Sequence, residues 1–397
     1  MTKHQLLLAA LGVCLFLGAC KKENSGGGPV ITGLRADQAN PNDTTLHYVN
    51  PSQYVILDGA GLSSVQSVTF DGIAATIDIA LAANNHFVVQ VPSIPFTSLD
   101  TTKANTIVVT TTHGSFTYHF PVVPPPPAVA AISNEFAHPG DVITLTGQFL
   151  YLIQSITFPG GIAASQFTSS PDGSSLTVTV PAGATTGGGI TLVSTGGTSS
   201  SLPAAGFRDT TGMLCDFDDI NTYSWGATAI IDSPSFTGNN GYFAQLSYSS
   251  GINAGDEQWW NTGRSINLNN VQWVPVANMG DPITSYAMKF EVFVKIPWTV
   301  GGIYIVPNYT WTYLADFAPW KTAPANTYVN SGQWQTIVIP LTNFQTNNGA
   351  GSAASSLSTL IGNNGFNAID LMLVDDGTTP ITNFDAGIDN IRVVKVQ

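Results

Sequence analysis

The chain has 397 residues, too many for one ordinary domain, and only 9% of them are charged, so we expect two or three sparsely charged domains. A net charge of −13 and the lack of a Lys/Arg cluster exclude nucleic-acid binding, because phosphate binding needs clustered cations. Abundant Gly, Ser, Thr, Asn and β-branched residues favour strands and turns.

The first residues have the pattern of an export signal. Residues 1–19 contain one early basic residue, Lys3, and an apolar run too short to be a permanent membrane anchor. The sequence "LGAC", which ends at Cys20, resembles a bacterial lipobox, and this resemblance implies cleavage before Cys20 and lipidation of its thiol. A plain secretory signal with a chance cysteine is the alternative. Residues 20–28 are expected to form a flexible polar tether.

Two similar segments follow the tether. The stretch "VILDGAGLSSVQSVTF" from Val55 aligns without gaps on "ITLTGQFLYLIQSITF" from Ile143, at an offset of 88 residues. A period of this size is a whole domain rather than a solenoid unit. Short alternating runs split by Gly, Asn and Pro predict a small β-sandwich in each copy. The apolar residues expected to face inward are Val55, Leu57, Val65, Ile143, Leu145 and Ile153.

The repeated pattern "V-x-L-x-G-x-x-L…V-x-F-x-G" resembles the IPT/TIG class of immunoglobulin-like domains. The resemblance implies one such domain over residues 29–122 and another over 128–205, and domains of this class are often spacers. Between them "PVVPPPP" runs from Pro121 to Pro127. We expect this run to adopt polyproline II and act as a stiff strut.

Residues 206–397 differ in composition from the rest. All eight Trp lie in this region, and all six His lie before residue 139. The region predicts a third domain, a C-terminal β-sandwich or jelly roll, with a short helix within 352–361. The whole chain is therefore predicted to be all-β, with two immunoglobulin-like sandwiches before this domain. The strand-like runs are Ala287–Val294, Gly302–Val306, Thr336–Leu341, Ala368–Val374 and Gly387–Val394.

The lack of His in residues 206–397 excludes a Ser-His-Asp or Cys-His constellation and a His-ligated zinc site there. A glycosidase needs only two carboxylates and stays an alternative. Its candidates are few, because the chain has four Glu, of which Glu23 is in the tether. We interpret Glu135 as part of a spacer domain and Glu291 as lying beside Lys289 on the polar face of a strand. Adjacent Asp256 and Glu257 would point to opposite faces of a strand.

The most aromatic stretch is "PWTVGGIYIVPNYTWTYLADFAPW", from Pro297 to Trp320. On a strand, Tyr309, Trp311 and Tyr313 would share one face and form a continuous strip. The strip could be core, and polar Thr on the other face fits that alternative equally well. Trp298 follows a proline where strands end or loops begin, and loops lie at the surface.

Exposed tryptophans on loops usually mark a binding surface, because their apolar area is costly to leave in water. Flat rings among Asn, Thr, Gln and Asp complement a neutral sugar, whose C–H face stacks on a ring while its hydroxyls meet polar groups. The predicted platform consists of Trp259, Trp260, Trp298, Tyr309, Trp311, Tyr313 and Trp320.

The segments 317–344 ("FAPWKTAPANTYVNSGQWQTIVIPLTNF") and 386–394 ("AGIDNIRVV") resemble the C-terminal domain of surface glycan-binding proteins from Bacteroidetes polysaccharide-utilisation systems. With the lipobox and the tandem domains, this resemblance covers nearly the whole chain. It implies a non-catalytic lipoprotein, exposed on the outer membrane, that hands polysaccharide to a partner transporter and a surface glycanase. A surface adhesin or spacer that binds protein is the rival interpretation, although such patches more often carry Arg and aliphatic anchors.

Carbohydrate-binding jelly rolls often hold a structural calcium between their first and last strands. Asp216 and Asp218 open the C-terminal domain and Asp389 closes it. Calcium takes six to eight oxygens, which these carboxylates and backbone carbonyls could supply. Aspartates that cap solvated turns are the alternative.

Overall fold

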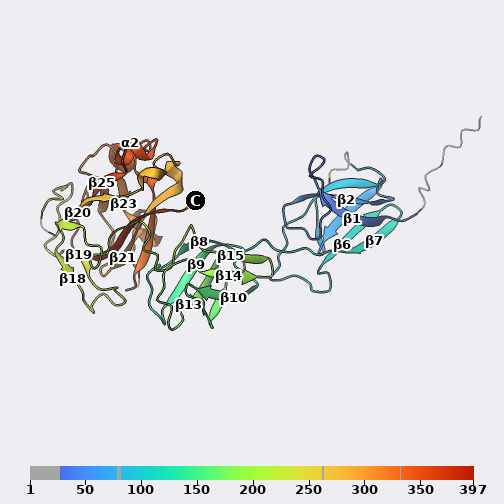
Figure 1. Ribbon diagram of the computed structural model, residues 1–397, viewed down its shortest axis with the longest axis horizontal. Helices are drawn as coiled ribbons and strands as arrows, with labels where there is room; N and C mark the ends of the chain where they lie inside the picture. Colours follow the sequence, from blue (N-terminus) through green and yellow to red (C-terminus); the bar gives the residue numbers. More distant parts are fainter. Residues whose placement is uncertain (1–26, 78–81, 262, 331) are drawn as a thin grey trace, which may run out of the picture. The chain divides into compact units, whose positions relative to one another are not determined.

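The computed structural model describes residues 27–77, 82–261, 263–330 and 332–397 (Figure 1). The signal segment 1–19 and Cys20 lie outside these residues. The described chain is all-β, as predicted, and none of its helices is long and apolar enough to cross a bilayer. Helix α2 (Leu357–Ile361) lies inside the predicted helical stretch. The chain divides into two compact units, one ending at Pro124 and one beginning at Pro125, which we describe separately.

The first unit is a sandwich of two antiparallel sheets. Val55 and Leu57 alternate inward along one sheet and pack with Val65 of the other, as the sequence predicted. One sheet has the order β1 (Val30–Ala36), β2 (Tyr54–Ala60), β5 (His86–Gln90). The other has the order β4 (Ile73–Ala74), β3 (Val65–Phe70), β6 (Thr106–Thr111), β7 (Gly114–His119).

A second sandwich opens the second unit. Ile143 and Leu145 are buried as predicted, but Ile153 is only half-buried, because it precedes a register shift at the start of its strand. One sheet has the order β12 (Phe167–Ser169), β13 (Ser175–Thr179), β9 (Val142–Gln148), β8 (Ala128–Ile132). The other has the order β11 (Ile162–Ala163), β10 (Ile153–Phe158), β14 (Thr191–Ser194), β15 (Gly197–Ser200).

One glycine of the repeat has the same role in both sandwiches. A Cβ on Gly59 would collide with the backbone carbonyl of Val30, and a Cβ on Gly147 would collide with that of Ala128. Each carbonyl belongs to the strand paired with the one that holds the glycine. The matched glycines therefore permit a close approach of backbones that no other residue allows.

The C-terminal sandwich completes the second unit, and its two antiparallel sheets enclose the largest core of the described chain. The first sheet has the order β18 (Ala229–Ile231), β19 (Phe243–Tyr248), β26 (Phe384–Lys395), β21 (Tyr286–Val294), β24 (Gln335–Pro340), with β16 (Met213–Cys215) also on β26. The second has the order β17 (Tyr223–Trp225), β20 (Ser265–Gln272), β25 (Phe366–Val374), β22 (Gly302–Pro307), β23 (Ala315–Phe317).

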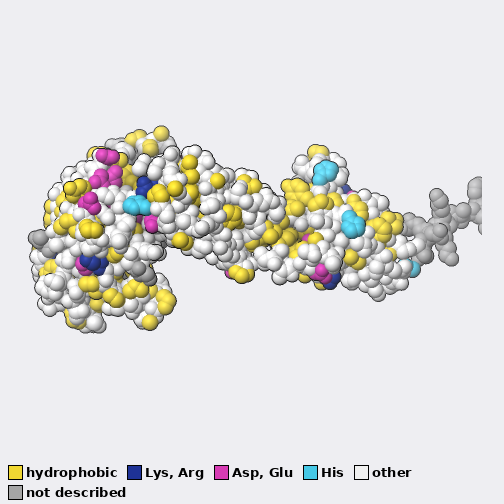
Figure 2. Space-filling view, turned by 90° about the horizontal axis from the view of Figure 1, so that it is seen from below, with side chains coloured by type: hydrophobic (Ala, Val, Ile, Leu, Met, Phe, Trp, Pro, Cys, Tyr) yellow, Lys and Arg dark blue, Asp and Glu magenta, His cyan; other side chains and the backbone are white. Residues whose placement is uncertain are grey.

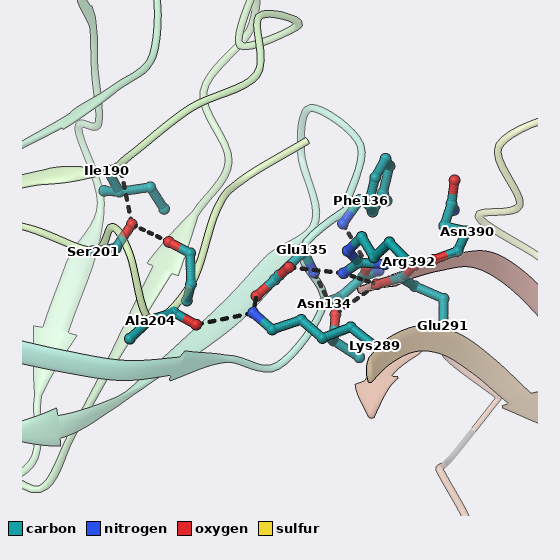
Figure 3. A network of polar contacts seen from close by, with 12 residues as sticks. Asn134, Glu135, Phe136, Ile190, Ser201, Ala204, Lys289, Glu291, Asn390 and Arg392 are labelled. Atoms are coloured by element: carbon teal, nitrogen blue, oxygen red, sulfur yellow. Dashed lines mark hydrogen bonds and ion pairs between the residues drawn. The ribbon is translucent and has the colours of Figure 1, made fainter. Parts of the chain in front are cut away.

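The second sandwich and the C-terminal sandwich share a buried ion-pair network (Figure 3). Lys289 Nζ donates to Glu135 Oε1 at 2.6 Å, and Arg392 Nη2 donates to Glu135 Oε2 at 2.7 Å. Arg392 also donates to both carboxylate oxygens of Glu291, at 2.9 and 3.0 Å. All four side chains are buried, and each charge is offset by an opposite one.

This network corrects two interpretations of the sequence. Glu135 does not belong to a spacer domain that is independent of the C-terminal sandwich, because its carboxylate pairs with Lys289 and Arg392 of that sandwich. Lys289 and Glu291 do share a face of β21, but the second sandwich covers that face. Thr336 of β24 joins the two sides, since its Oγ1 donates to Glu291 at 2.8 Å and accepts the N–H of Glu135 at 2.7 Å.

Candidate functional site

The outer face of the sheet formed by β17, β20, β25, β22 and β23 carries a small apolar layer. Ile303 and Ile305 of β22 point into the main core, so Tyr304 and Val306 point to the opposite face. Trp259, from the loop between β19 and β20, packs against this outer layer. The sheet therefore provides a rigid apolar base for a ring that lies outside the core.

Four further rings lie around Trp259. The ring of Tyr309 stacks on it, with 5.5 Å between centroids and 27° between planes. Trp225 lies 6.1 Å away at 39°, and Trp260 lies 5.7 Å away, nearly perpendicular. Trp311 lines the same cavity as Trp259 and Trp260. We call these five residues the aromatic patch.

The aromatic patch is exposed to solvent. The exposed fractions are 40% for Trp225, 55% for Trp260, 40% for Tyr309 and 37% for Trp311, and Trp259 is half-buried between its neighbours. Contiguous exposed aromatic area of this kind marks an interaction site. Tyr and Trp suit such a site because they offer a large flat surface and a polar tip.

A cavity of about 590 Å³ opens beside the rings. Its polar side chains are the amides of Asn253 and Gln258 and the carboxylates of Asp256 and Glu257. None of the described residues that line it is Lys or Arg. The cavity thus combines flat apolar surfaces with hydrogen-bond acceptors and donors and has an acidic character. Its lining residues run from Asn253 to Trp260, and Trp311 completes it.

The loop that carries Trp259 and Trp260 is anchored by a buried arginine. Arg264 Nη1 lies 3.1 Å from Asp256 Oδ2, and its Nη2 donates to the backbone carbonyl of Asp256 at 2.8 Å. The same carbonyl accepts the N–H of Asp375. These contacts hold the loop on the sheet, so the two rings lie on a fixed backbone.

Trp311 has a separate support. Tyr304 meets it edge to face, with 6.1 Å between ring centroids. The Tyr304 hydroxyl donates to Asp376 Oδ2 at 2.7 Å. Burial raises the pKa of Tyr304, and the hydrogen bond to Asp376 raises it further. The phenol therefore stays protonated and keeps donating this bond over the physiological range.

The structure brings together four of the seven predicted platform residues, Trp259, Trp260, Tyr309 and Trp311. The segment 309–313 is not a strand, since it belongs to the turn that joins β22 to β23, and the continuous strip that a strand would give is absent. Left-handed backbone at Asn308 and Tyr309 reverses the chain there. Tyr309 and Trp311 consequently face solvent, and Tyr313 packs against the main core.

The other two predicted residues lie apart from the aromatic patch. Trp298 is only 2% exposed and meets Phe317 and Phe384 edge to face in the core. Trp320 is half-buried against the same core, and its Nε1 donates to the carbonyl of Gly301 at 2.6 Å. The loop positions after proline therefore anchor these indoles inward rather than exposing them.

Trp225 is the member of the aromatic patch that the sequence did not reveal. It ends β17, a strand of three residues, and Tyr223 of the same strand packs against the main core. Residues two apart normally share a face, but a register shift between them turns Trp225 to the outer face. Trp225 does not lie in one of the aromatic-rich stretches identified in the sequence. Its place in the aromatic patch follows from the register shift alone.

The predicted calcium ligands do not form a metal site. Among the described residues, no group of three or more His, Cys, Asp or Glu side chains is arranged to hold a metal ion. Asp216 Oδ1 accepts the N–H groups of Asp218 and Ile220, which makes it a turn cap. Asp218 accepts the N–H of Tyr242. Asp389 is buried in β26, and this burial raises the pKa of its carboxyl well above its usual range.

Comparison with protein families gives one match. Residues 207–395 match the surface glycan-binding protein B xyloglucan binding domain. The match spans the C-terminal sandwich, and with it every residue of the aromatic patch. No curated protein is significantly similar to the chain.

Two solved structures are similar to the chain. The crystal structure of surface glycan-binding protein B from Prevotella bryantii is 20% identical, with a TM-score of 0.69 over 94% of this chain and 99% of that chain. The corresponding protein from a complex xyloglucan utilization locus of Bacteroides uniformis is also 20% identical, with a TM-score of 0.49 over 93% of this chain and all of that one. The first of these similarities shows that the fold is shared.

Proposed function

We propose that this chain is a surface glycan-binding protein, as the match of its C-terminal sandwich suggests, and that its aromatic patch captures a neutral polysaccharide. The observation that carries the proposal is the clustering of Tyr309 and Trp225 around Trp259 beside an open polar cavity. Pyranose rings stack on such indoles, and the amides and carboxylates of the cavity meet their hydroxyls.

The charge of the surface supports a neutral ligand. Asp256 and Glu257 line the cavity, and like charge repels an anionic glycan. Figure 2 shows that uncharged side chains dominate the visible face of the molecule and that charged ones are few. The family description directs the first choice of ligand to xyloglucan, a neutral polysaccharide.

We propose that the protein binds without cleaving. Of the three Glu among the described residues, Glu135 and Glu291 are held in the buried ion-pair network. Neither can reach a glycosidic bond, and Glu257 alone is exposed. Glycosidases use two opposed Asp or Glu carboxylates, and these positions supply no such pair made of Glu.

We also propose that Cys20 is lipidated and that the lipid holds the protein on the outer face of the outer membrane. Residues 20–28 would then be the tether. Domain limits at 29–122, 128–205 and 206–397 complete this proposal, and a transporter and a glycanase of the same system would receive the captured polysaccharide.

Calorimetry on residues 125–397 tests the binding proposal. We expect xyloglucan or mixed-linkage β-glucan to bind, and carboxymethyl cellulose, an anionic analogue, to bind much more weakly. A reducing-sugar assay on the same samples should stay at background. The proposal is wrong if no neutral glycan of the panel binds, or if binding survives replacement of both Trp259 and Trp311 by Ala.

A further inference from the structure

The turn that presents Tyr309 has an unfavourable backbone. Residues Pro307–Thr310 form a tight turn, closed by a hydrogen bond of 2.9 Å from the N–H of Thr310 to the carbonyl of Pro307. Its two central residues, Asn308 and Tyr309, have φ values of 47° and 55°. Such turns prefer Asn followed by Gly, so a tyrosine at the second position needs support from its surroundings.

That support comes from the sheet beneath the turn. Asp370 of β25 is fully buried, and its Oδ2 accepts the N–H of Tyr309 at 2.9 Å. The N–H of Asn308 donates to the carbonyl of Ala368 on the same strand. The turn is thus fixed to β25 at both of its strained residues.

The opposite side of the aromatic patch has a matching support. Asn267 of β20 is fully buried, and its Nδ2 donates to the backbone carbonyl of Trp225 at 3.0 Å. The next residue, Gly226, has a φ of 110°, and a Cβ there would collide with the amide of Asn267. The backbone after Trp225 therefore lies so close to the Asn267 amide that a side chain at position 226 would collide with it.

Asn267 and Asp370 are direct partners in the β20–β25 register, so their side chains lie on the same face of the sheet. The Oδ1 atoms of both side chains are buried without a hydrogen-bond partner in the described part of the chain. Buried polar groups with unmet hydrogen-bonding capacity are costly to keep and call for an explanation. Neither side chain is exposed to solvent, since both are fully buried.

We propose that Asn267 and Asp370 are positioning residues of the aromatic patch, which hold the backbone at Trp225 and at Tyr309 so that these rings flank Trp259. Trp259 comes from a different loop, whereas Trp225 lies on the edge strand β17 and Tyr309 lies in the turn between β22 and β23. The buried pair at the centre of the sheet sets the spacing of the three rings. This inference rests on the proposed function for its binding readout but not for its spectroscopic one.

The test uses residues 125–397, one compact unit, with soluble xyloglucan as the probe. D370A removes the acceptor of the Tyr309 N–H, and we expect affinity to fall about tenfold. D370N keeps an acceptor oxygen and should stay within about threefold of wild type. In a Y309A background, D370A should have no further effect, because Asp370 acts through Tyr309. D385N, which alters a carboxylate on the other sheet, is the matched control.

Near-ultraviolet circular dichroism supplies a readout that needs no glycan. D370A and Y309A should change the aromatic signal in the same way, and D370N should restore it. An unchanged signal and affinity in D370A, or additive losses in the double variant, would overturn the proposal. If D370A does not fold, N267A with W225A forms the equivalent cycle at the other ring. If wild type binds no neutral glycan of the panel, the proposed function fails while the spectra still decide this inference.

Discussion

Arg392 Nη2 lies 2.7 Å from Oε2 of Glu135, a residue 257 positions earlier in the chain. The arginine belongs to the last strand of the C-terminal sandwich, and the glutamate follows β8 of the second sandwich. A buried charge pair of this kind has a fixed geometry, because neither group can turn to water. The second sandwich is therefore fixed to the C-terminal sandwich by buried charges.

We predict that E135Q destabilises the fold of residues 125–397. Removing this charge leaves Lys289 without its carboxylate partner and Arg392 with only Glu291. Loss of one member of a buried pair typically costs about 3–5 kcal/mol of unfolding free energy. Urea denaturation measures this change directly.

K395Q is the control for that measurement. Lys395 pairs with Asp281 at 2.9 Å, but both side chains are partly exposed. Surface pairs contribute about 0–1 kcal/mol, so the unfolding free energy should barely change. Equal effects of the two substitutions would show that the network at Glu135 does not stabilise the contact between the sandwiches.

Two tryptophan substitutions should separate binding from folding. W311A removes an exposed ring of the aromatic patch, and we expect a loss of affinity of about 2 kcal/mol, roughly thirtyfold, with little change in melting temperature. W298A removes a ring from the core and should cost about 3–5 kcal/mol of folding stability. Calorimetry with xyloglucan and thermal melts of each variant provide both numbers. Parallel losses of affinity and stability in W311A would place that ring in the core instead.

The sequence predicts the all-β fold well because alternation and glycine positions are local signals. Val55 and Ile143 face inward in equivalent places, and Gly59 and Gly147 mark the same close strand contact. The joint between the second and C-terminal sandwiches was not predictable in this way. Glu135 has no sequence neighbour that reveals Arg392, since only the tertiary fold brings these charges together.

The aromatic patch was only partly predictable, because local sequence signals identify some of its residues and the tertiary fold decides the others. Trp259 and Trp311 occur in dense aromatic stretches and were identified, although Trp311 lies in a turn and not on a strand. Trp225 reaches the patch through a register shift, which depends on the neighbouring strand. Trp298 occupies a loop start and still lies in the core, because its indole N–H finds backbone carbonyls at Val300 and Gly301.

The proposed lipid anchor at Cys20 can be tested in cells. C20S removes the proposed site of lipid attachment, so the protein should leave the outer-membrane fraction or keep its signal segment. Fractionation with mass determination measures both. A C20S protein that stays in the outer membrane like wild type would contradict lipidation at this residue.

The last prediction concerns pH. Burial raises the pKa of Asp370 from 3.8 to about 6, against the smaller opposing effect of the hydrogen bond from the Tyr309 N–H. Because the folded-state pKa is the higher one, folding favours the protonated carboxyl. This stabilisation is fully present below about pH 3.8 and is lost as the pH rises through 6.

Between pH 7.5 and 4.5, wild type should therefore gain on the order of 2 kcal/mol of unfolding free energy that D370N does not gain. Other carboxyls with raised pKa, such as Asp389, are present in both proteins, so the difference between the two urea-denaturation series isolates Asp370. Identical pH dependence in both proteins would mean that Asp370 titrates as an ordinary carboxyl in the fold.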